Sequence, residues 1–429
     1  MEAIFTIVAK NYIPLANVLG DSIQLQHPNL PFFIVVADTA DGLIDYSKQR
    51  YSVIASEEMS ISNLTEMAFK YNVTEFCTAL KPFAFKHLFK QGYKKVLYLD
   101  PDIYVFNSLN KIFESLDSSS MVLTPHFQTP ELAYSGLFRE GNILFAGIFN
   151  LGFCGLRASE NGGKITEWWC AKLKDYCYAD RTDGLHVDQK WADFIPTLFP
   201  DVHIERGLGY NVAVWNWHER KLNFHDNSYW VTNRITNGPE EPVTFYHYSN
   251  YKFKNASDYR QFVPVLSTKY RDIESISEFY ADLLIREHIS DQLSKLNYSF
   301  ATFDNNVVIV QFHRRFYRQL LEEGTHTDNP FITGVPNSFY NRLKTKNLIG
   351  QSEGLDKLNE INFSGFDRKL KYLNLLAKLV KNIIGFNRYA LLCKFLFRYV
   401  RPENQVFLVK SNTDPVSFVN ENRYINTEK

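Results

Sequence analysis

The first half of the chain alternates apolar strand patterns with helical patterns, and this alternation limits the possible folds more than any other sequence feature. The predicted strands are residues 4–9, 31–37, 51–55 and 96–99, and the predicted helices are residues 13–26, 57–71 and 81–91. Strands that are apolar on both faces and separated by helices form a parallel sheet with helices on both sides. We therefore predict an α/β fold with a mostly parallel sheet.

The predicted strand at residues 96–99 ends in the sequence Asp100-Pro101-Asp102. Pro101 has no backbone N–H to donate, so strand pairing must loosen at this point. Side chains two residues apart in an extended segment share a face, and the two aspartates can therefore point into one cleft. Paired carboxylates are typical ligands of Mg²⁺ and Mn²⁺. The alternative is an Asp-Pro-Asp turn that binds nothing.

Ligands of parallel α/β sheets bind beyond the carboxyl ends of the strands. Asp38 follows the predicted strand at residues 31–37, and Asp100 follows the one at residues 96–99. One crevice can therefore hold a nucleotide above the sheet and a metal ion beside it. We predict that Asp38, Asp100 and Asp102 contribute to this binding site.

The length and composition of the chain indicate a folded protein of more than one part. At 429 residues it exceeds the size of a single core, so we predict a domain at residues 1–260 and a mainly helical region at residues 261–429. The 47 basic and 47 acidic residues balance, which argues against a general nucleic-acid binder. The five cysteines form no C-x-x-C pair, and the sequence starts with neither a signal-peptide pattern nor a long apolar stretch. We therefore expect a cytoplasmic protein.

Four motifs occur in a fixed order along the chain. They are Tyr98-Leu99-Asp100-Pro101-Asp102, Phe149-Asn150-Leu151-Gly152-Phe153, Val187-Asp188-Gln189 and Phe245-Tyr246-His247-Tyr248-Ser249. Together they resemble the motif set of GT-A glycosyltransferases, in particular the retaining glycogenin-like enzymes and the bacterial lipopolysaccharide galactosyltransferases. The resemblance covers roughly residues 1–255 and implies a GT-A, Rossmann-like fold for the predicted catalytic domain at residues 1–260.

The resemblance implies transfer of a sugar, a hexose, from a nucleotide sugar to a glycan or lipid-linked glycan, with retention of the anomeric configuration. Asp100, Asp102 and His247 would bind Mn²⁺ or Mg²⁺, and this set of two carboxylates and one imidazole suits Mn²⁺. Lys252 would neutralise the leaving diphosphate, although a solvated surface lysine is the alternative. The expected setting is the synthesis of a bacterial-type surface polysaccharide or lipopolysaccharide.

The resemblance also places Asn150, Asp188 and Gln189 around the donor sugar as the catalytic group. Asn150 would orient the sugar, while Asp188 and Gln189 would hold its hydroxyls and stabilise oxocarbenium-like charge. The alternative for Asp188 is a helix N-cap, because a helical pattern follows it. Residues 207–218 contain two glycines, two tryptophans and two asparagines, and they form either a wall of the sugar site or a packed surface loop.

The sequence departs from the family pattern at one position. The relatives carry an acidic residue near the end of the first strand to bind uracil, whereas this chain has Lys10-Asn11-Tyr12 there. A UDP-sugar is therefore the default donor by resemblance only. Two alternatives remain for the function: an inverting transferase, which needs a carboxylate base, and a non-catalytic nucleotide-sugar-binding scaffold subunit.

The C-terminal region has a different character. Its predicted elements are a helical stretch at residues 273–297, a short strand at 306–312, loops and turns at 330–352, and basic helices at 368–401. Residues 368–401 contain nine Lys or Arg and no Asp or Glu, interleaved with apolar residues. Such helices bind the surface of anionic membranes, here the inner face of the cell membrane. The alternative is a helix pair that packs its apolar sides on the catalytic domain.

Overall fold

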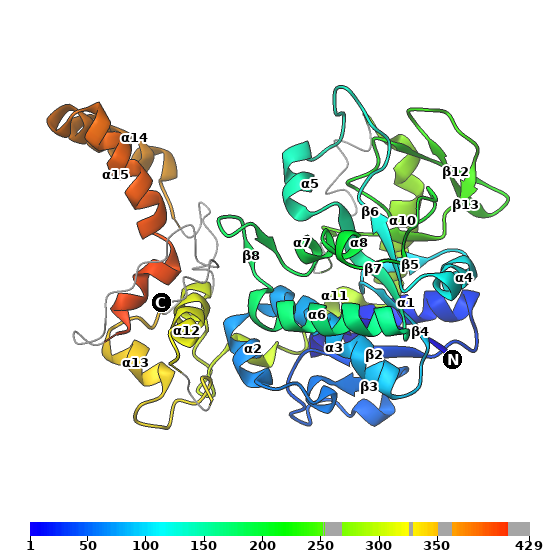
Figure 1. Cartoon of the computed structure of the whole chain (residues 1–429), viewed down its shortest axis with the longest axis horizontal. Coiled ribbons are helices and arrows are strands. Elements are labelled where there is room, and N and C mark those ends of the chain that lie inside the picture. Colours follow the sequence, from blue (N-terminus) through cyan, green and yellow to red (C-terminus); the bar gives the residue numbers. More distant parts are fainter. Residues whose placement is uncertain (252, 254–267, 326–328, 351–362, 411–429) are drawn as a thin grey trace. The chain divides into compact units, whose positions relative to one another are not determined.

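The computed structural model describes residues 1–251, 253, 268–325, 329–350 and 363–410 (Figure 1). The chain divides into two compact units. The first unit comprises residues 1–62 and 73–299, and the second comprises residues 63–72 and 300–429. The domain boundary predicted near residue 260 lies outside the described residues and stays a prediction.

A seven-stranded sheet forms the centre of the first unit, in the order β10-β6-β7-β4-β1-β2-β3. Its strands are β1 (Glu2–Val8), β2 (Phe32–Val36), β3 (Ser52–Ala55), β4 (Lys95–Leu99), β6 (Met121–Pro125), β7 (Phe149–Arg157) and β10 (Val202–Ile204). All neighbouring strands are parallel except β7, which runs antiparallel to both β4 and β6. The predicted α/β class with a mostly parallel sheet is confirmed.

Helices cover both faces of this sheet because successive strand residues point to opposite sides. In β1, Ile4 packs in a core cluster with residues of α1 (Ile13–Gln26) and α4 (Asn110–Ser118). The next residue, Phe5, makes an edge-to-face ring contact with Phe85, with 4.8 Å between ring centroids. Phe85 belongs to the helix α3 (Val73–Lys90), which packs against α6 (Glu160–Tyr176). The sheet is therefore buried on both faces, as its apolar strands predict.

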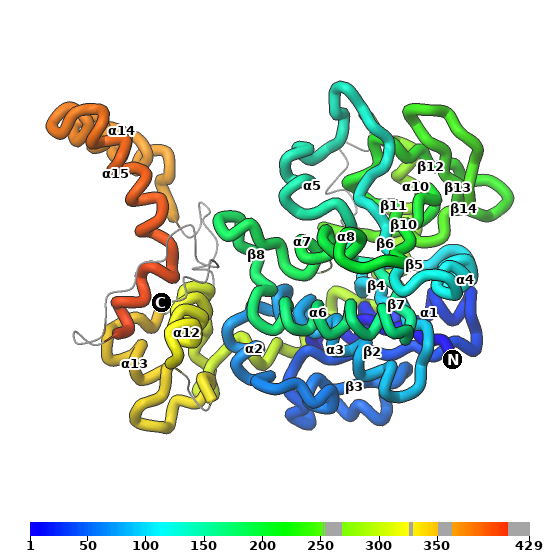
Figure 2. The backbone as a smooth tube through the Cα atoms, in the orientation of Figure 1, coloured from blue at the N-terminus to red at the C-terminus, as the bar shows by residue number. Residues whose placement is uncertain are grey.

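A second, three-stranded sheet lies next to the carboxyl end of β4. It consists of β5 (Ile103–Val105), β11 (Val212–Ala213) and β15 (Phe245–His247), with β15 in the middle. β15 runs antiparallel to β5, and Figure 2 shows the backbone of β4, β5 and β7 converging in this region. The turn at Pro101 thus passes the chain from the large sheet into the small one.

The remaining elements of the first unit surround these two sheets. They are α5 (Glu140–Ala146), β8 (Ala179–Asp180), β9 (Leu185–His186), α7 (Gln189–Ala192), α8 (Ile195–Leu198), β12 (Arg220–His225), β13 (Ser228–Asn233), β14 (Glu241–Pro242), α10 (Glu274–Arg286) and α11 (Ile289–Leu293). The last two confirm the helical stretch predicted at residues 273–297.

The second unit has a core built around Phe69. This residue lies in α2 (Leu64–Lys70) and contacts the rings of Phe303, Tyr317 and Phe339. The other α-helices in the described part of this unit are α12 (Gln311–Glu322), α13 (Phe339–Thr345), α14 (Phe366–Ile384) and α15 (Phe386–Tyr399). Among the helices that the structure describes, none has the length and apolarity needed to cross a membrane.

Three of the predicted elements are corrected by the structure. The predicted strand at residues 306–312 is wrong, because this segment forms a single bridge between Thr302 and Val308 and then enters α12. The helix predicted at residues 57–71 is interrupted: a 3₁₀ turn at Ser56–Met59 precedes α2. The segment at residues 330–352, predicted to be loops and turns, contains α13.

Candidate metal centre

Two carboxylates and an imidazole converge where β4 passes into β5. His247 Nε2 lies 3.1 Å from Asp102 Oδ1 and 3.7 Å from Asp100 Oδ2, and one ligand atom of each residue fits within a 4.8 Å span. The strand register explains the convergence, because His247 of β15 pairs with Ile103 of β5, next to Asp102. In addition, the N–H of Tyr248 donates to the carbonyl of Asp102 at 2.8 Å. The three residues can hold a divalent metal ion.

Asn211 orients the imidazole of His247. The Oδ1 atom of Asn211 lies 3.2 Å from Nδ1 of His247, so a proton on Nδ1 leaves Nε2 as the lone-pair donor that faces the aspartates. Asn211 is fully buried and has a left-handed backbone with φ 54°. Its Nδ2 donates to Thr124 Oγ1 and to Asn150 Oδ1, which fixes the direction of Oδ1. Partners of this kind set the tautomer of metal-binding histidines.

Gly152 is needed for the position of His247. A Cβ atom on Gly152 would lie 2.3 Å from Cε1 of the His247 ring and 2.9 Å from Oδ1 of Asn150. Both contacts are shorter than atomic packing allows. The glycine of the Phe149–Phe153 motif therefore gives the imidazole the space that it occupies.

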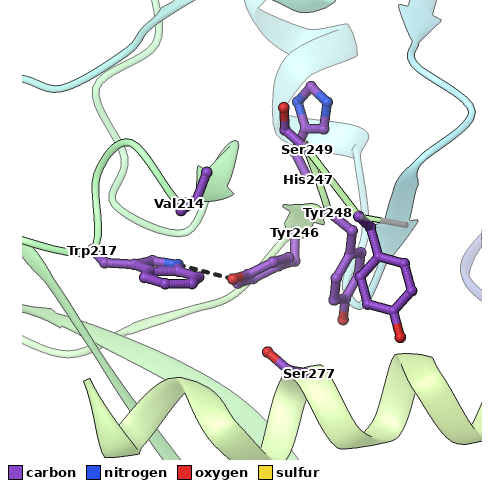
Figure 3. A pocket seen from close by; sticks show the side chains of 8 residues that line it. Val214, Trp217, Tyr246, His247, Tyr248, Ser249 and Ser277 are labelled. Carbon is purple, nitrogen blue, oxygen red and sulfur yellow. Dashed lines mark hydrogen bonds between the residues drawn. The ribbon is translucent and has the colours of Figure 1, made fainter. Parts of the chain in front are cut away.

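Aromatic residues support β15 from the side opposite to His247. Figure 3 shows the His247 ring pointing away from Tyr246 and Tyr248, and Nε1 of Trp217 donates to the Tyr246 hydroxyl at 2.9 Å. The Tyr248 ring stacks on Tyr280 of α10 at 3.7 Å between centroids. This packing holds the strand that presents the histidine.

The charged groups of the site shift one another's pKa values. Burial raises the pKa of Asp100, although the positive charges of Lys81 and His247 act in the opposite direction. Burial lowers the pKa of His247, but the negative charge of Asp102 and its hydrogen bond outweigh burial, so the pKa is raised overall. A cation at this point would therefore be stabilised by the carboxylates, and a bound metal would compete with the imidazole proton.

A buried ion pair joins Lys81 of α3 to Asp188, with 1% and 3% of these side chains exposed. The ammonium group of Lys81 also donates to the carbonyl of Leu151 at 2.7 Å and lies 4.1 Å from the centre of the Tyr98 ring. The Tyr98 hydroxyl donates in turn to Asp100. Burial lowers the pKa of Lys81, but the negative charges of Asp188 and Asp100 outweigh it and raise the pKa, so Lys81 stays protonated. Asp188 occupies the N-cap position of α7, as the alternative predicted, but its side chain forms no capping hydrogen bond there and pairs with Lys81 instead.

The structure brings Asn150 and Gln189 together in the same region. Asn150 Nδ2 donates to Gln189 Oε1 at 3.3 Å, and the N–H of Leu151 donates to the same oxygen at 3.1 Å. Gln189 Nε2 donates to the carbonyl of Ala146 at 3.1 Å. Because β7 runs antiparallel to β4, its first residues reach the carboxyl end of β4, where the N–H of Asp100 donates to the carbonyl of Gly152 at 2.7 Å.

A cavity of about 370 Å³ adjoins these residues. Asn150 and Gln189 form part of its lining, and the rings of Phe138, Phe145 and Trp215 form another part. The Trp215 ring also contacts the His247 ring edge-on, with 5.0 Å between centroids. The cavity is therefore next to the metal-binding residues and combines amide groups with aromatic faces.

The predicted nucleotide-binding residue Asp38 follows β2 and is fully buried. Its carboxylate accepts hydrogen bonds from the backbone N–H groups of Thr39 at 2.8 Å, Ser299 at 3.1 Å and Lys10 at 3.4 Å. The side chain of Lys10, two residues beyond the end of β1, is buried and pairs with Asp41. The role of Asp38 stays a prediction, and Lys252 lies outside the described residues.

Two further residues of the site were missed by the sequence analysis. Lys81 left a signal, because it is the one charged residue in the apolar run at residues 79–85. Asn211 lies in the segment at residues 207–218, which was predicted to form either a wall of the sugar site or a packed surface loop. The residues from Tyr210 to His218 are buried, and Trp215 among them lines the cavity. The spacing of these residues in the sequence indicates neither the pairing of Lys81 with Asp188 nor that of Asn211 with His247.

Comparisons with known proteins give two relatives of unknown function and several similar folds. The chain is 23% identical over 317 residues to the uncharacterized protein YfnF of Bacillus subtilis (strain 168), a match that covers 71% of this chain and 99% of YfnF. It is 24% identical over 207 residues to the uncharacterized protein YfnD of the same organism, covering 47% of this chain and 62% of YfnD. No protein-family model matches the chain.

Several solved structures that the chain is similar to are glycosyltransferases. One is the galactosyltransferase LgtC in complex with donor and acceptor sugar analogs, with 16% identity, a TM-score of 0.39, and coverage of 69% of this chain and 98% of LgtC. Another is mouse xyloside xylosyltransferase 1, with 13% identity, a TM-score of 0.37, and coverage of 58% and 98%. A third is the glycosyltransferase GlyE of Streptococcus pneumoniae TIGR4, with 18% identity, a TM-score of 0.30, and coverage of 49% and 46%.

Proposed function

We propose that the chain is a metal-dependent glycosyltransferase that moves a hexose from a nucleotide sugar to a glycan acceptor. The observation that carries the proposal is the convergence of Asp100, Asp102 and His247 beside the buried pair of Lys81 and Asp188. A bound divalent ion, with Mn²⁺ the best fit to these ligands, would supply positive charge to the diphosphate of the donor.

The protein's own residues prepare this site in advance. Asn211 holds the His247 ring so that Nε2 faces the two aspartates. Lys81 holds the Asp188 carboxylate in a fixed position, where its negative charge would favour a sugar ring that becomes cationic in the transition state. Charges that are already in position do not have to rearrange as the transition state forms. They therefore lower the barrier of the reaction.

Asn150 and Gln189 are the residues that we propose hold the donor sugar. Both are largely buried, and both line the cavity next to the metal-binding residues. A buried amide that binds a sugar hydroxyl is left unsatisfied when the wrong epimer enters, so such groups discriminate strongly between sugars. The aromatic rings of the cavity offer apolar surface on which a sugar can pack.

Two observations favour retention over inversion. An inverting enzyme needs a carboxylate base that reaches the acceptor hydroxyl. Among the described residues that line the cavity, none is Asp or Glu. Asp188, which precedes Gln189 in the chain, is buried and forms an ion pair with Lys81. We therefore keep the retaining reaction as part of the proposal.

The finer features of the function rest on the motif resemblance. UDP is the default nucleotide, with Asp38 and Lys252 as the residues proposed to act near it. The acceptor is proposed to be a glycan or a lipid-linked glycan of a surface polysaccharide or lipopolysaccharide. The reaction would take place in the cytoplasm, at the inner face of the membrane.

The test is a donor screen with and without metal. The purified chain, freed of metal by chelation, is incubated with UDP-hexoses before and after addition of Mn²⁺, and release of UDP is measured. The proposal expects metal-dependent release, with product of retained anomeric configuration by NMR. Inverted product would contradict the retaining reaction. Nucleotide sugars that raise the melting temperature without any turnover would indicate a non-catalytic scaffold subunit instead.

A further inference from the structure

The helices α14 (Phe366–Ile384) and α15 (Phe386–Tyr399) differ from every other long helix in the described part of the chain, because neither contains a buried residue. Their large apolar side chains are widely exposed, with 67% of Leu375, 73% of Ile383 and 68% of Phe397 accessible. Exposed apolar surface of this extent marks a site of interaction. Within the second unit neither helix buries its apolar side, and the alternative that the pair packs on the catalytic domain stays a prediction.

The apolar residues of α14 follow a helical repeat. Phe366, Leu370, Leu373, Ala377, Val380 and Ile384 are spaced alternately by four and three residues. Side chains with this spacing share one face of a helix. Lys371, Lys378 and Lys381 follow the same repeat on another face, which also carries Asn374 and Asn382. The helix is therefore amphipathic, with a basic polar face.

Five basic residues of the helix pair are available for an external partner. Among the described residues, no ion pair involves Lys371, Lys378, Lys381, Arg388 or Lys394. From residue 368 to residue 401 there are nine Lys or Arg and no acid, whereas the whole chain has equal numbers of both charges. The rest of the chain must therefore carry a net excess of acid.

We propose that α14 and α15 dock the protein on the surface of an anionic lipid bilayer. The apolar faces would enter the boundary between headgroups and acyl chains, and the basic residues would contact anionic headgroups. A second copy of the chain is a poorer partner, since joining two such surfaces would bring like charges together. An anionic surface attracts the helix pair and repels the acidic remainder of the chain, which favours one orientation on the membrane. The proposal does not depend on the proposed transferase activity.

The experiment uses the full-length protein and vesicles of defined composition. Co-sedimentation is measured with phosphatidylcholine vesicles and with vesicles that also contain phosphatidylglycerol, at low and high salt. Cys393 is the one exposed cysteine of the chain and offers a position for an environment-sensitive fluorophore. We expect binding only to the anionic vesicles, weakening at high salt, with a blue shift of the fluorophore on binding.

A charge-reversal variant tests the helix pair directly. Lys371→Glu, Lys378→Glu and Lys381→Glu together should lower the partition coefficient by about a hundredfold or more, since each basic residue near an anionic surface contributes about 1 kcal/mol. The matched control reverses Lys221, Lys344 and Lys346, three exposed lysines outside the helix pair, and so makes the same change in net charge. The control should keep most of the binding.

Three results would overturn the proposal. One is full-length protein that ignores anionic vesicles at low salt, and another is equal loss of binding in the two triple variants. The third is a dimer in light scattering that the helix-pair variant abolishes, in protein that does not bind vesicles, because a second copy would then cover these faces. Donor hydrolysis in solution, measured on the same samples, shows separately whether the transferase proposal holds.

Discussion

The ammonium group of Lys81 and the carboxylate of Asp188 form an ion pair in the interior of the first unit. Lys81 also lies over the ring of Tyr98, whose hydroxyl donates to Asp100. A continuous chain of contacts therefore runs from the proposed sugar-side carboxylate to one of the metal-binding carboxylates. Lys81 thus connects the proposed sugar-binding part of the candidate site with the metal-binding part.

Removal of Lys81 should be costly because it leaves a buried carboxylate without its partner. We expect Lys81→Met to lower the free energy of unfolding by about 3–5 kcal/mol. The double variant Lys81→Met with Asp188→Asn should be more stable than Lys81→Met alone, since its buried side chain is neutral. Urea denaturation of the wild type, both single variants and the double variant measures this coupling. A loss below about 1 kcal/mol in Lys81→Met would contradict a structural role of the pair.

Asp188→Asn separates electrostatic catalysis from donor binding. The amide keeps the shape of the carboxylate but lacks its charge, which matters most when the anomeric centre becomes cationic. We expect kcat to fall by about a hundredfold or more, while the Kd for the donor changes only several-fold. Steady-state kinetics and calorimetric binding measure the two effects. Reduced stability with unchanged kcat would assign Asp188 a structural role only.

Gly152→Ala should displace the His247 ring, because the added Cβ would overlap the ring. We expect weaker metal binding together with a loss of stability of about 1–3 kcal/mol. The matched control is Gly163→Ala in α6, where the new methyl group would contact nothing within 4 Å. This control should be neutral or stabilise the protein by up to about 1 kcal/mol. Equal metal affinity in both variants would show that Gly152 is not needed for the site.

His126, which also lines the cavity, predicts a pH dependence of stability. Burial lowers the pKa of His126 from 6.5 to about 4, so the unfolded chain binds a proton more readily than the folded protein between these values. His126 therefore contributes to the free energy of unfolding above about pH 6.5, and this contribution is lost as the pH falls towards 4. The full loss is of the order of 3 kcal/mol.

The control for this prediction is His126→Gln, which cannot titrate. Unfolding free energies at pH 7 and pH 4.5 should differ less in the variant than in the wild type, by about 2 kcal/mol. The same difference in both proteins would show that His126 does not have its lowered pKa.

The sheet and the two aspartates were predictable because their signals are local. Apolar runs separated by helical patterns predicted the parallel strands, and Pro101 marked the point where β4 ends. The segment at residues 306–312 has an equally apolar run, yet it was wrongly predicted to be a strand. Ile309 in this run packs in a core cluster with Phe316 and Phe69. Its conformation is set by this long-range packing, which a local pattern does not contain.

The rest of the site could not be predicted from the residues alone. His247 is separated from Asp102 by more than 140 residues of sequence, and only the motif resemblance indicated that they meet. Lys81 and Asp188 are paired through the packing of α3 beside β7, and Asn211 reaches His247 through a left-handed turn. Such pairings follow from the assembled fold, and no spacing in the sequence encodes them.

Isothermal titration of UDP into the metal-free protein, with and without Mn²⁺, tests the central claim most directly. The wild type and the control Asp226→Asn, whose carboxylate is exposed in the turn between β12 and β13, should bind UDP much more tightly when Mn²⁺ is present. Asp102→Asn should fold normally, since its side chain is partly exposed, and should lose most of this metal-dependent gain. Equal enhancement by Mn²⁺ in Asp102→Asn and the wild type would contradict the metal centre.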